Sequence, residues 1–134
     1  MAFIDIKKTD LTHIQKIDAE HQQMALFINQ LYSSAKKSDF HDTYNIFKNF
    51  LSATNEHFFT EETLMKENNY QGYFSHKLEH DRVIKKLKSI DEQFYANINV
   101  INAEELSNLK KWFFNHLELS DKKLGAFLIE KVFR

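Results

Sequence analysis

Six histidine and glutamate side chains lie on helical stripes that are otherwise apolar. They are His21, His57, Glu61, His76, His80 and His116. Imidazole and carboxylate groups are costly to bury unless they are paired, hydrogen-bonded or bound to a metal ion. One buried histidine usually indicates a core residue with a hydrogen-bond partner. Six such groups in four helical segments instead predict a metal centre inside a helix bundle, where bundles build such sites.

Two pairs among these residues have the spacing of neighbours on one helix face. His57 and Glu61 are four residues apart, and so are His76 and His80. Residues four apart lie one above the other on a helix. We therefore expect the two side chains of each pair to converge on one site.

A second carboxylate near the site is expected from Asp121, which follows His116 by five residues. Five residues rotate by about 140° on an ideal helix, so the two side chains would point in different directions. Asp121 can join the site only if the helix ends, tightens or bulges near Ser120.

The number and type of these residues limit the metals that fit. Five histidines and two carboxylates exceed the ligands that one tetrahedral zinc ion uses. They suit two metal ions bridged by the carboxylates. Because the set contains no thiolate, iron, manganese, zinc and cobalt all fit, and the spacing does not choose among them.

The segments that carry these residues have the periodicity of long amphipathic helices. From Ile14 to Leu31, the apolar residues and His21 step alternately by three and four residues. The fold class predicted for residues 1–134 is an all-α single domain, an antiparallel up-down-up-down four-helix bundle. The predicted elements are an arm over 1–12, helices over 13–37, 40–67, 72–95 and 103–120, and a short terminal helix over 122–132.

The composition excludes several classes of function. The chain has 134 residues, no cysteine, two glycines and a net charge of -1. Disulfides and cysteine nucleophiles are impossible, and Gly72 and Gly125 are too far apart for a phosphate-binding glycine loop. The charge gives no overall attraction to nucleic acid, and the apolar runs are too short for membrane insertion. The N-terminus lacks the apolar region of a secretory signal, so a cytoplasmic location is expected.

Short stretches along the chain together resemble the hemerythrin family, in particular its single-domain bacterial members, the bacteriohemerythrins. Every ligand type occurs in the order that is usual for the family. The resemblance implies a four-helix bundle that holds a non-haem di-iron site. The matching stretches are Ile17–His21, Asn29–Tyr32, His57–Met65, His76–His80 and Trp112–Gly125.

The resemblance also implies how the ligands divide between two iron ions. Three histidines bind one iron and two bind the other, while two carboxylates and an oxo or hydroxo group bridge both. The first iron is then closed, whereas the second has one free position where O2 binds as a ligand. The implied metal ligands are His76, His80 and His116 for the first iron, His21 and His57 for the second, and Glu61 and Asp121 for both.

O2 binding in the family is reversible, so the resemblance implies a non-enzymatic protein for oxygen carriage, storage or delivery. Nitric oxide and small anions are further candidate ligands of the same position. The O2 pocket is expected to be lined by Met24, Ile28, Trp112 and Phe113. Phe113 stands where the family usually has leucine, and we expect it to narrow the pocket.

Two other functions fit the same metal centre. One is a module that senses O2, nitric oxide or redox state through a protein partner in trans. The other is a weak di-iron enzyme with peroxidase or nitric-oxide-consuming activity. Sensing would favour a fused output domain, for which 134 residues leave no space, so carriage is the expected function.

Two local patterns have simpler interpretations than the functions they suggest. His76 to His80 match the H-x-x-E-H motif of zinc peptidases, in which Glu79 would be the general base. That interpretation leaves His21, His57 and Glu61 unexplained. Glu79 is therefore expected to be an exposed residue between two ligands. The basic run between Lys77 and Lys88 is interpreted as a solvated helix face, and no nucleic-acid partner is expected.

Overall fold

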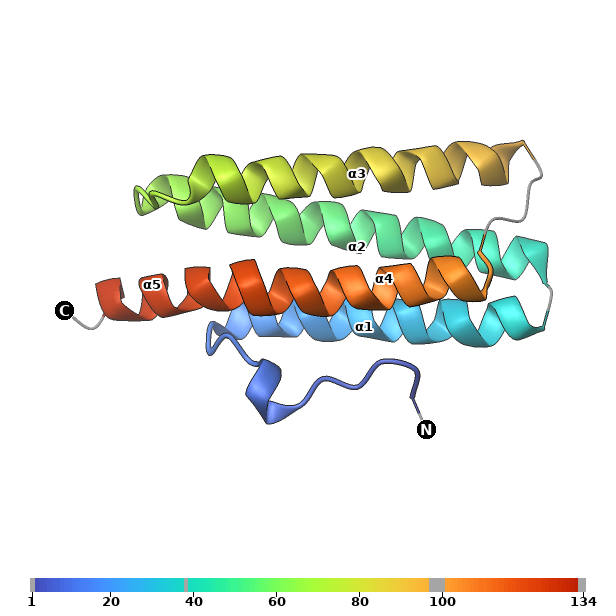
Figure 1. Ribbon diagram of the computed structural model, residues 1–134, viewed down its shortest axis with the longest axis horizontal. Helices are drawn as coiled ribbons and strands as arrows, with labels where there is room; N and C mark the ends of the chain where they lie inside the picture. Colours follow the sequence, from blue (N-terminus) through green and yellow to red (C-terminus); the bar gives the residue numbers. More distant parts are fainter. Residues whose placement is uncertain (1, 38, 97–100, 133–134) are drawn as a thin grey trace.

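Four long helices form an antiparallel up-down-up-down bundle in the computed structural model, which describes residues 2–37, 39–96 and 101–132 (Figure 1). This arrangement, with no strand among the described residues, confirms the predicted fold class. The helices are α1 (Gln15–Lys36), α2 (Phe40–Glu67), α3 (Tyr73–Tyr95) and α4 (Ala103–His116), followed by the π-helical turn η2 (Leu117–Asp121) and α5 (Lys122–Val132).

The run predicted as one helix over 103–120 is divided in the structure. α4 ends at His116, and the next five residues form the wider π turn before α5 continues in nearly the same direction (Figure 1). The starts of α2 and α4 are capped, because the side chains of Asp39 and Asn102 accept hydrogen bonds from backbone N–H groups three residues later. These caps fix where each helix enters the bundle.

The bundle core consists of two apolar clusters. Between them lies a layer of buried histidine and carboxylate side chains, the polar layer. On α1, His21 lies at the level of this layer, with Ile17 of the smaller cluster on one side and Met24 of the larger cluster on the other. Asp121 lies at the same level on the run from η2 to α5. The smaller cluster contains Ile17, Met65, Leu124 and Leu128.

The N-terminal arm, which contains the short helix η1 (Lys8–Asp10), packs along the bundle (Figure 1). Ile4 is buried, and Asn29 of α1 pairs with both of its backbone groups, at 2.7 Å to the N–H and 3.0 Å to the carbonyl. The ring of Phe3 stacks on Tyr32 with centroids 4.3 Å apart. The arm is therefore held by paired backbone groups as well as by apolar contact.

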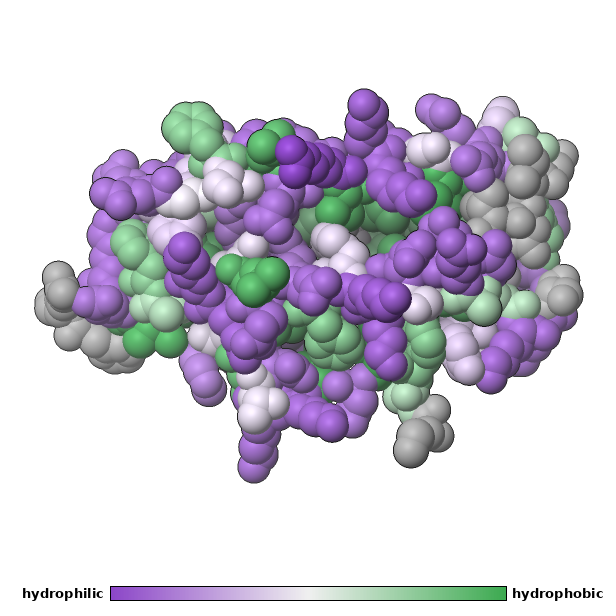
Figure 2. Space-filling view, in the orientation of Figure 1, coloured by the Kyte–Doolittle hydropathy of each residue, from purple (hydrophilic) through white to green (hydrophobic). Residues whose placement is uncertain are grey.

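The outer surface of the bundle is mostly hydrophilic on the face that Figure 2 shows. Apolar side chains are visible on this face in the hollow between α3 and α4, whose lining includes Leu87, Leu109 and Trp112. Among the described residues, no helix is both long enough and apolar enough to cross a membrane.

Gly125 allows the arm to approach α5 closely. A Cβ atom added there would lie 2.7 Å from the backbone oxygen of Thr12 and 2.9 Å from its Cβ. These atoms belong to the docked arm and cannot turn away as the end of a flexible side chain could. The small residue is therefore required by contact between the two segments.

We predict that Gly125→Ala lowers the free energy of unfolding by about 1–3 kcal/mol, because the added methyl group overpacks the contact with Thr12. Urea denaturation of the iron-free protein measures the effect. Ala126→Gly is the control, because it measures the effect of exchanging alanine and glycine at an exposed position of the same helix. If Gly125→Ala instead stabilised the protein by about 0.5–1 kcal/mol, as expected for an uncrowded helical glycine, the contact would be unimportant.

Candidate metal centre

All seven residues predicted as metal ligands lie together in the polar layer, and each is at most 5% exposed. Their nitrogen and oxygen atoms form two overlapping groups, and within each group the atoms lie within 4.8 Å of one another. Both groups include the same two carboxylates. The first group is Glu61, His76, His80, His116 and Asp121, and the second is His21, His57, Glu61 and Asp121.

Glu61 is the carboxylate that α2 brings to both groups. Its Oε1 lies 3.4 Å from Nε2 of His57, one turn earlier on the same helix. The same oxygen lies 3.2 Å and 3.1 Å from the Nε2 atoms of His76 and His80 on α3. The two pairs with four-residue spacing therefore converge on one point, with their Nε2 atoms directed inwards.

Asp121 reaches the layer because η2 is a π turn. This turn supplies the bulge that the five-residue spacing requires, and it places Oδ1 of Asp121 3.0 Å from Nε2 of His116. Oδ1 also lies 3.1 Å from Nε2 of His76, whereas Oδ2 lies 2.7 Å and 3.3 Å from the Nε2 atoms of His21 and His57. One oxygen thus faces the three-histidine group and the other faces the two-histidine group.

Two further carboxylates, which the sequence patterns did not predict, hold ligand histidines from outside. Glu20 pairs with Nδ1 of His57 at 2.9 Å, and Glu62 pairs with Nδ1 of His80 at 2.9 Å. Each is adjacent in sequence to a ligand, and a step of one residue turns it by about 100° towards the neighbouring helix. An acidic residue next to a predicted ligand was therefore the available signal. Such contacts fix the ring orientation and leave Nε2 free to bind metal.

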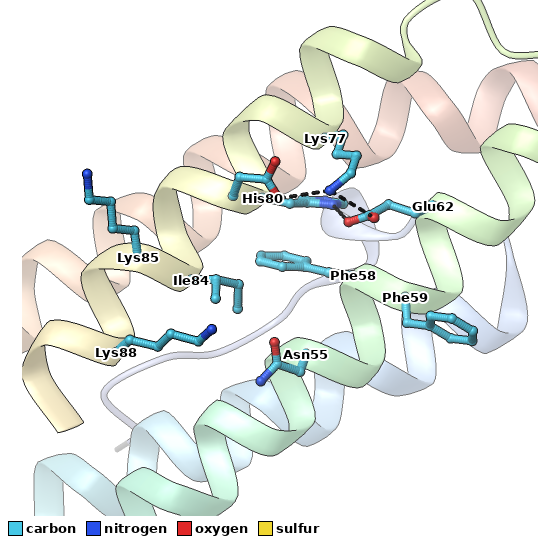
Figure 3. A pocket seen from close by; sticks show the side chains of 10 residues that line it. Asn55, Phe58, Phe59, Glu62, Lys77, His80, Ile84, Lys85 and Lys88 are labelled. Carbon is cyan, nitrogen blue, oxygen red and sulfur yellow. Dashed lines mark hydrogen bonds and ion pairs between the residues drawn. The ribbon is translucent and has the colours of Figure 1, made fainter. Parts of the chain in front are cut away.

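A groove between α2 and α3 approaches the layer from solvent but is closed by an aromatic ring (Figure 3). The groove has a volume of ≈ 500 Å³, and Phe58 and His80 are among the residues that line it. The Phe58 ring stacks on the His80 imidazole with centroids 3.8 Å apart and planes 8° apart. Phe58 thereby shields one face of a predicted ligand, while Glu62 and Lys77 form an ion pair at the end of the groove beside His80 (Figure 3).

The charges in the layer shift the pKa values of several of its members. Burial lowers the pKa values of His57, His76 and His116, but the neighbouring carboxylates outweigh this effect. The charge of Glu61 and a hydrogen bond to Asp121 raise the pKa of His57 to about 10. Contacts with the same two carboxylates raise the pKa of His76 to about 9 and that of His116 to about 10. Burial and Asp121 raise the pKa of Glu61, yet the imidazoles, His57 first, hold it below its usual range.

Several buried polar atoms of the layer have no hydrogen-bond partner in the protein. These include Oε2 of Glu61 and both ring nitrogens of His116. Nε2 of His116 is 3.0 Å from Asp121, so the two atoms are close but are not aligned for a hydrogen bond. Buried atoms of this kind are rare in folded proteins, and a bound ion or an ordered water is the usual partner that satisfies them. Imidazole and carboxylate donors in two groups with shared carboxylates fit a pair of iron ions.

The residues predicted to line an O2 pocket lie on two sides of the layer. Phe113 packs edge-on against His21, with ring centroids 5.8 Å apart, and therefore lies beside the two-histidine group. Trp112 instead stacks on His116, with ring centroids 5.7 Å apart, and lies beside the three-histidine group. The other two predicted pocket residues, both fully buried in the same apolar cluster as Phe113, are Met24 and Ile28.

Comparison with known proteins identifies the family. The family model described as the hemerythrin HHE cation binding domain matches residues 12–128. A bacteriohemerythrin of Pseudomonas aeruginosa is 31% identical over 111 residues, which cover 82% of this chain and 71% of that protein. A bacteriohemerythrin of Methylococcus capsulatus is 24% identical over 117 residues, which cover 87% and 89% of the two chains. The chain belongs to the hemerythrin family.

Solved structures support the same fold. The crystal structure of a wild-type hemerythrin superimposes with a TM-score of 0.89 at 22% sequence identity, covering 93% of this chain and 97% of the other. A point variant of hemerythrin gives a TM-score of 0.90 at 23% identity. Proteins of the hemerythrin family bind O2 at a di-iron site and are not enzymes, so the peptidase interpretation of the H-x-x-E-H motif does not apply.

We predict that His57→Ala lowers both the iron bound per chain and the stability gained on adding iron. The substitution removes one ligand of the two-histidine group, and metal binding contributes to folding. Iron analysis after desalting and urea denaturation with and without iron measure the two effects. His41→Ala is the control, because His41 is exposed near the start of α2. A His57→Ala protein that binds as much iron as the wild type would show that the ligand set is wrong.

We predict that the iron-free protein loses stability as the pH rises from about 6.5 to about 10. The raised pKa values of His57, His76 and His116 mean that these imidazoles bind protons more tightly when folded. Their contribution is complete below pH 6.5 and is lost as the pH passes the folded-state pKa values. Iron requires unprotonated imidazoles, so iron binding should release protons. Urea denaturation in excess chelator measures the profile, and equal stability at pH 6.5 and 10 would contradict it.

Proposed function

We propose that this chain binds two iron ions in the polar layer and carries or stores O2 by reversible binding on the two-histidine side. When bound, the iron pair would supply a redox-active metal that can take up an exogenous ligand. His76, His80 and His116 would hold one iron, and His21 and His57 would hold the other. The carboxylates that would hold both irons are Glu61 and Asp121.

The orientation of Asp121 is the observation that carries this proposal. Its two oxygens face different histidine groups, at 3.0 Å from His116 and 2.7 Å from His21. A carboxylate that only paired with protonated histidines would not need to divide its oxygens between groups of unequal size. Division between three and two histidines leaves fewer protein ligands on the second side, which is where an exogenous ligand can bind.

Carriage requires that O2 leaves without oxidising the centre irreversibly. Water and anions promote such oxidation, so the surroundings of the two-histidine group should be dry and apolar. Phe113 packs against His21 and is 2% exposed, and Met24 and Ile28 of the adjoining cluster are also buried. These side chains would exclude water from the side on which O2 binds.

The visible absorption spectrum of the iron-loaded protein tests the proposal. The protein is reduced without oxygen, exposed to air and then degassed, with the iron-free protein as the control. We expect a charge-transfer band that appears in air and fades on degassing. Immediate conversion to a stable ferric spectrum would contradict carriage, and it would instead favour a redox or nitric-oxide sensor that acts through a partner in trans.

We predict that Phe113→Leu changes the O2 dissociation rate and the autoxidation rate more than it changes stability. The smaller side chain widens the space beside His21, whereas the packing loss should be about 1 kcal/mol. Stopped-flow absorbance and urea denaturation measure the two quantities. Phe47→Leu, at a fully buried site among core aromatic rings, is the control for packing alone. Unchanged O2 dissociation and autoxidation in Phe113→Leu would exclude this role.

A further inference from the structure

Glu79 lies between two predicted ligands on α3 and faces both the π turn and the residue immediately before that turn. Its Oε2 accepts a hydrogen bond of 2.8 Å from the hydroxyl of Ser120, the residue before Asp121. Its Oε1 lies 3.5 Å from Nδ1 of His116, the residue at which α4 ends. One carboxylate therefore spans the segment that must be widened for Asp121 to reach the layer.

The π turn needs such support because wide helical turns are uncommon and are found mostly at functional sites. Within η2, Leu119 is 72% exposed, whereas Ser120 and Asp121 turn inwards and are buried. The hydrogen bond from Ser120 ties the inward part of the turn to α3. Without it, the side chains around the turn would lose a fixed point next to Asp121.

Nδ1 of His116 provides a second, independent observation that supports a role for Glu79. Nδ1 of His116 is buried and has no partner with hydrogen-bond geometry, and the Glu79 carboxylate lies just outside hydrogen-bond range of it. A histidine that binds metal through Nε2 carries its proton on Nδ1 and usually donates it to a carboxylate, carbonyl or water. Glu20 and Glu62 already supply such acceptors for His57 and His80.

We infer that Glu79 is a positioning residue that fixes His116 and Asp121 for metal binding, an inference that rests on the proposed di-iron centre. It does so by accepting the Ser120 hydrogen bond and by facing Nδ1 of His116. The motif from His76 to His80 thus contributes two predicted ligands. Glu79, which lies between them, positions two others, His116 and Asp121.

The exposure of Glu79 makes this role separable from a structural one. Its side chain is 42% exposed and borders a hollow of ≈ 250 Å³ that is also lined by Ser75 and Leu119. Removing the carboxylate leaves no buried void, so the iron-free bundle should keep its stability. A residue needed only for folding would lower the stability of the iron-free and iron-loaded proteins equally.

The test compares Glu79→Ala, Glu79→Gln and Ser120→Ala with the wild type. Iron affinity is measured by competition with a chelator, and urea denaturation follows the iron-free proteins. Glu118→Gln is the matched control, because Glu118 lies on the same turn but pairs outwards with Lys122. We expect Glu79→Ala to weaken iron binding by about 10-fold to 100-fold without lowering iron-free stability below that of the control.

The remaining variants distinguish positioning from folding. Glu79→Gln keeps an oxygen for Ser120 but removes the charge that faces His116, so it should weaken iron binding less than Glu79→Ala and shift the visible ferric bands. Wild-type iron affinity in both Glu79→Ala and Ser120→Ala would overturn the inference, as would an equal loss of stability with and without iron. Failure of the wild type itself to bind two irons would instead refute the proposed function.

Discussion

Burial of two carboxylates and five imidazoles in the middle of a small helical bundle is the constraint on which the rest of the structure depends. Each group alone would destabilise the core, and breaking buried charge pairs is strongly unfavourable. The bundle meets this constraint by placing all seven at one level, between two apolar clusters, where carboxylate oxygens face imidazole nitrogens. Several atoms still lack hydrogen-bond partners, and a bound metal pair would satisfy Glu61 Oε2 and His116 Nε2.

The unequal division of the histidines makes the two sides of the site chemically different. The five imidazoles lie around two shared carboxylates, three in the crowded three-histidine group and two in the two-histidine group, which is the open side because it has fewer protein ligands. Acidic residues on the outside hold ligand rings, so that each Nε2 stays directed inwards. Phe113 then closes the open side with apolar surface, while Phe58 and Trp112 cover the crowded side. Rigid helices thus bring the predicted metal-binding groups together, and under the proposed function the apolar side chains around them would exclude water from the site of O2 binding.

Most of the fold could be predicted from periodicity, because the alternation of three and four residues leaves little choice of inward face. The buried site could be predicted because polar residues interrupt those faces. The position of Asp121 could be predicted only conditionally, since its spacing from His116 requires a bulge that depends on tertiary contacts. The contacts of Glu79 and the side on which Trp112 lies were not predictable, because both depend on how neighbouring helices are rotated against each other.

A crystal structure of the iron-loaded protein, with anomalous diffraction recorded at the iron absorption edge, tests the central claim most directly. Two iron peaks are expected, one beside the three-histidine group and one beside the two-histidine group, with Glu61 and Asp121 in contact with both. A single iron peak, or two irons held without a shared carboxylate, would contradict the account of the site.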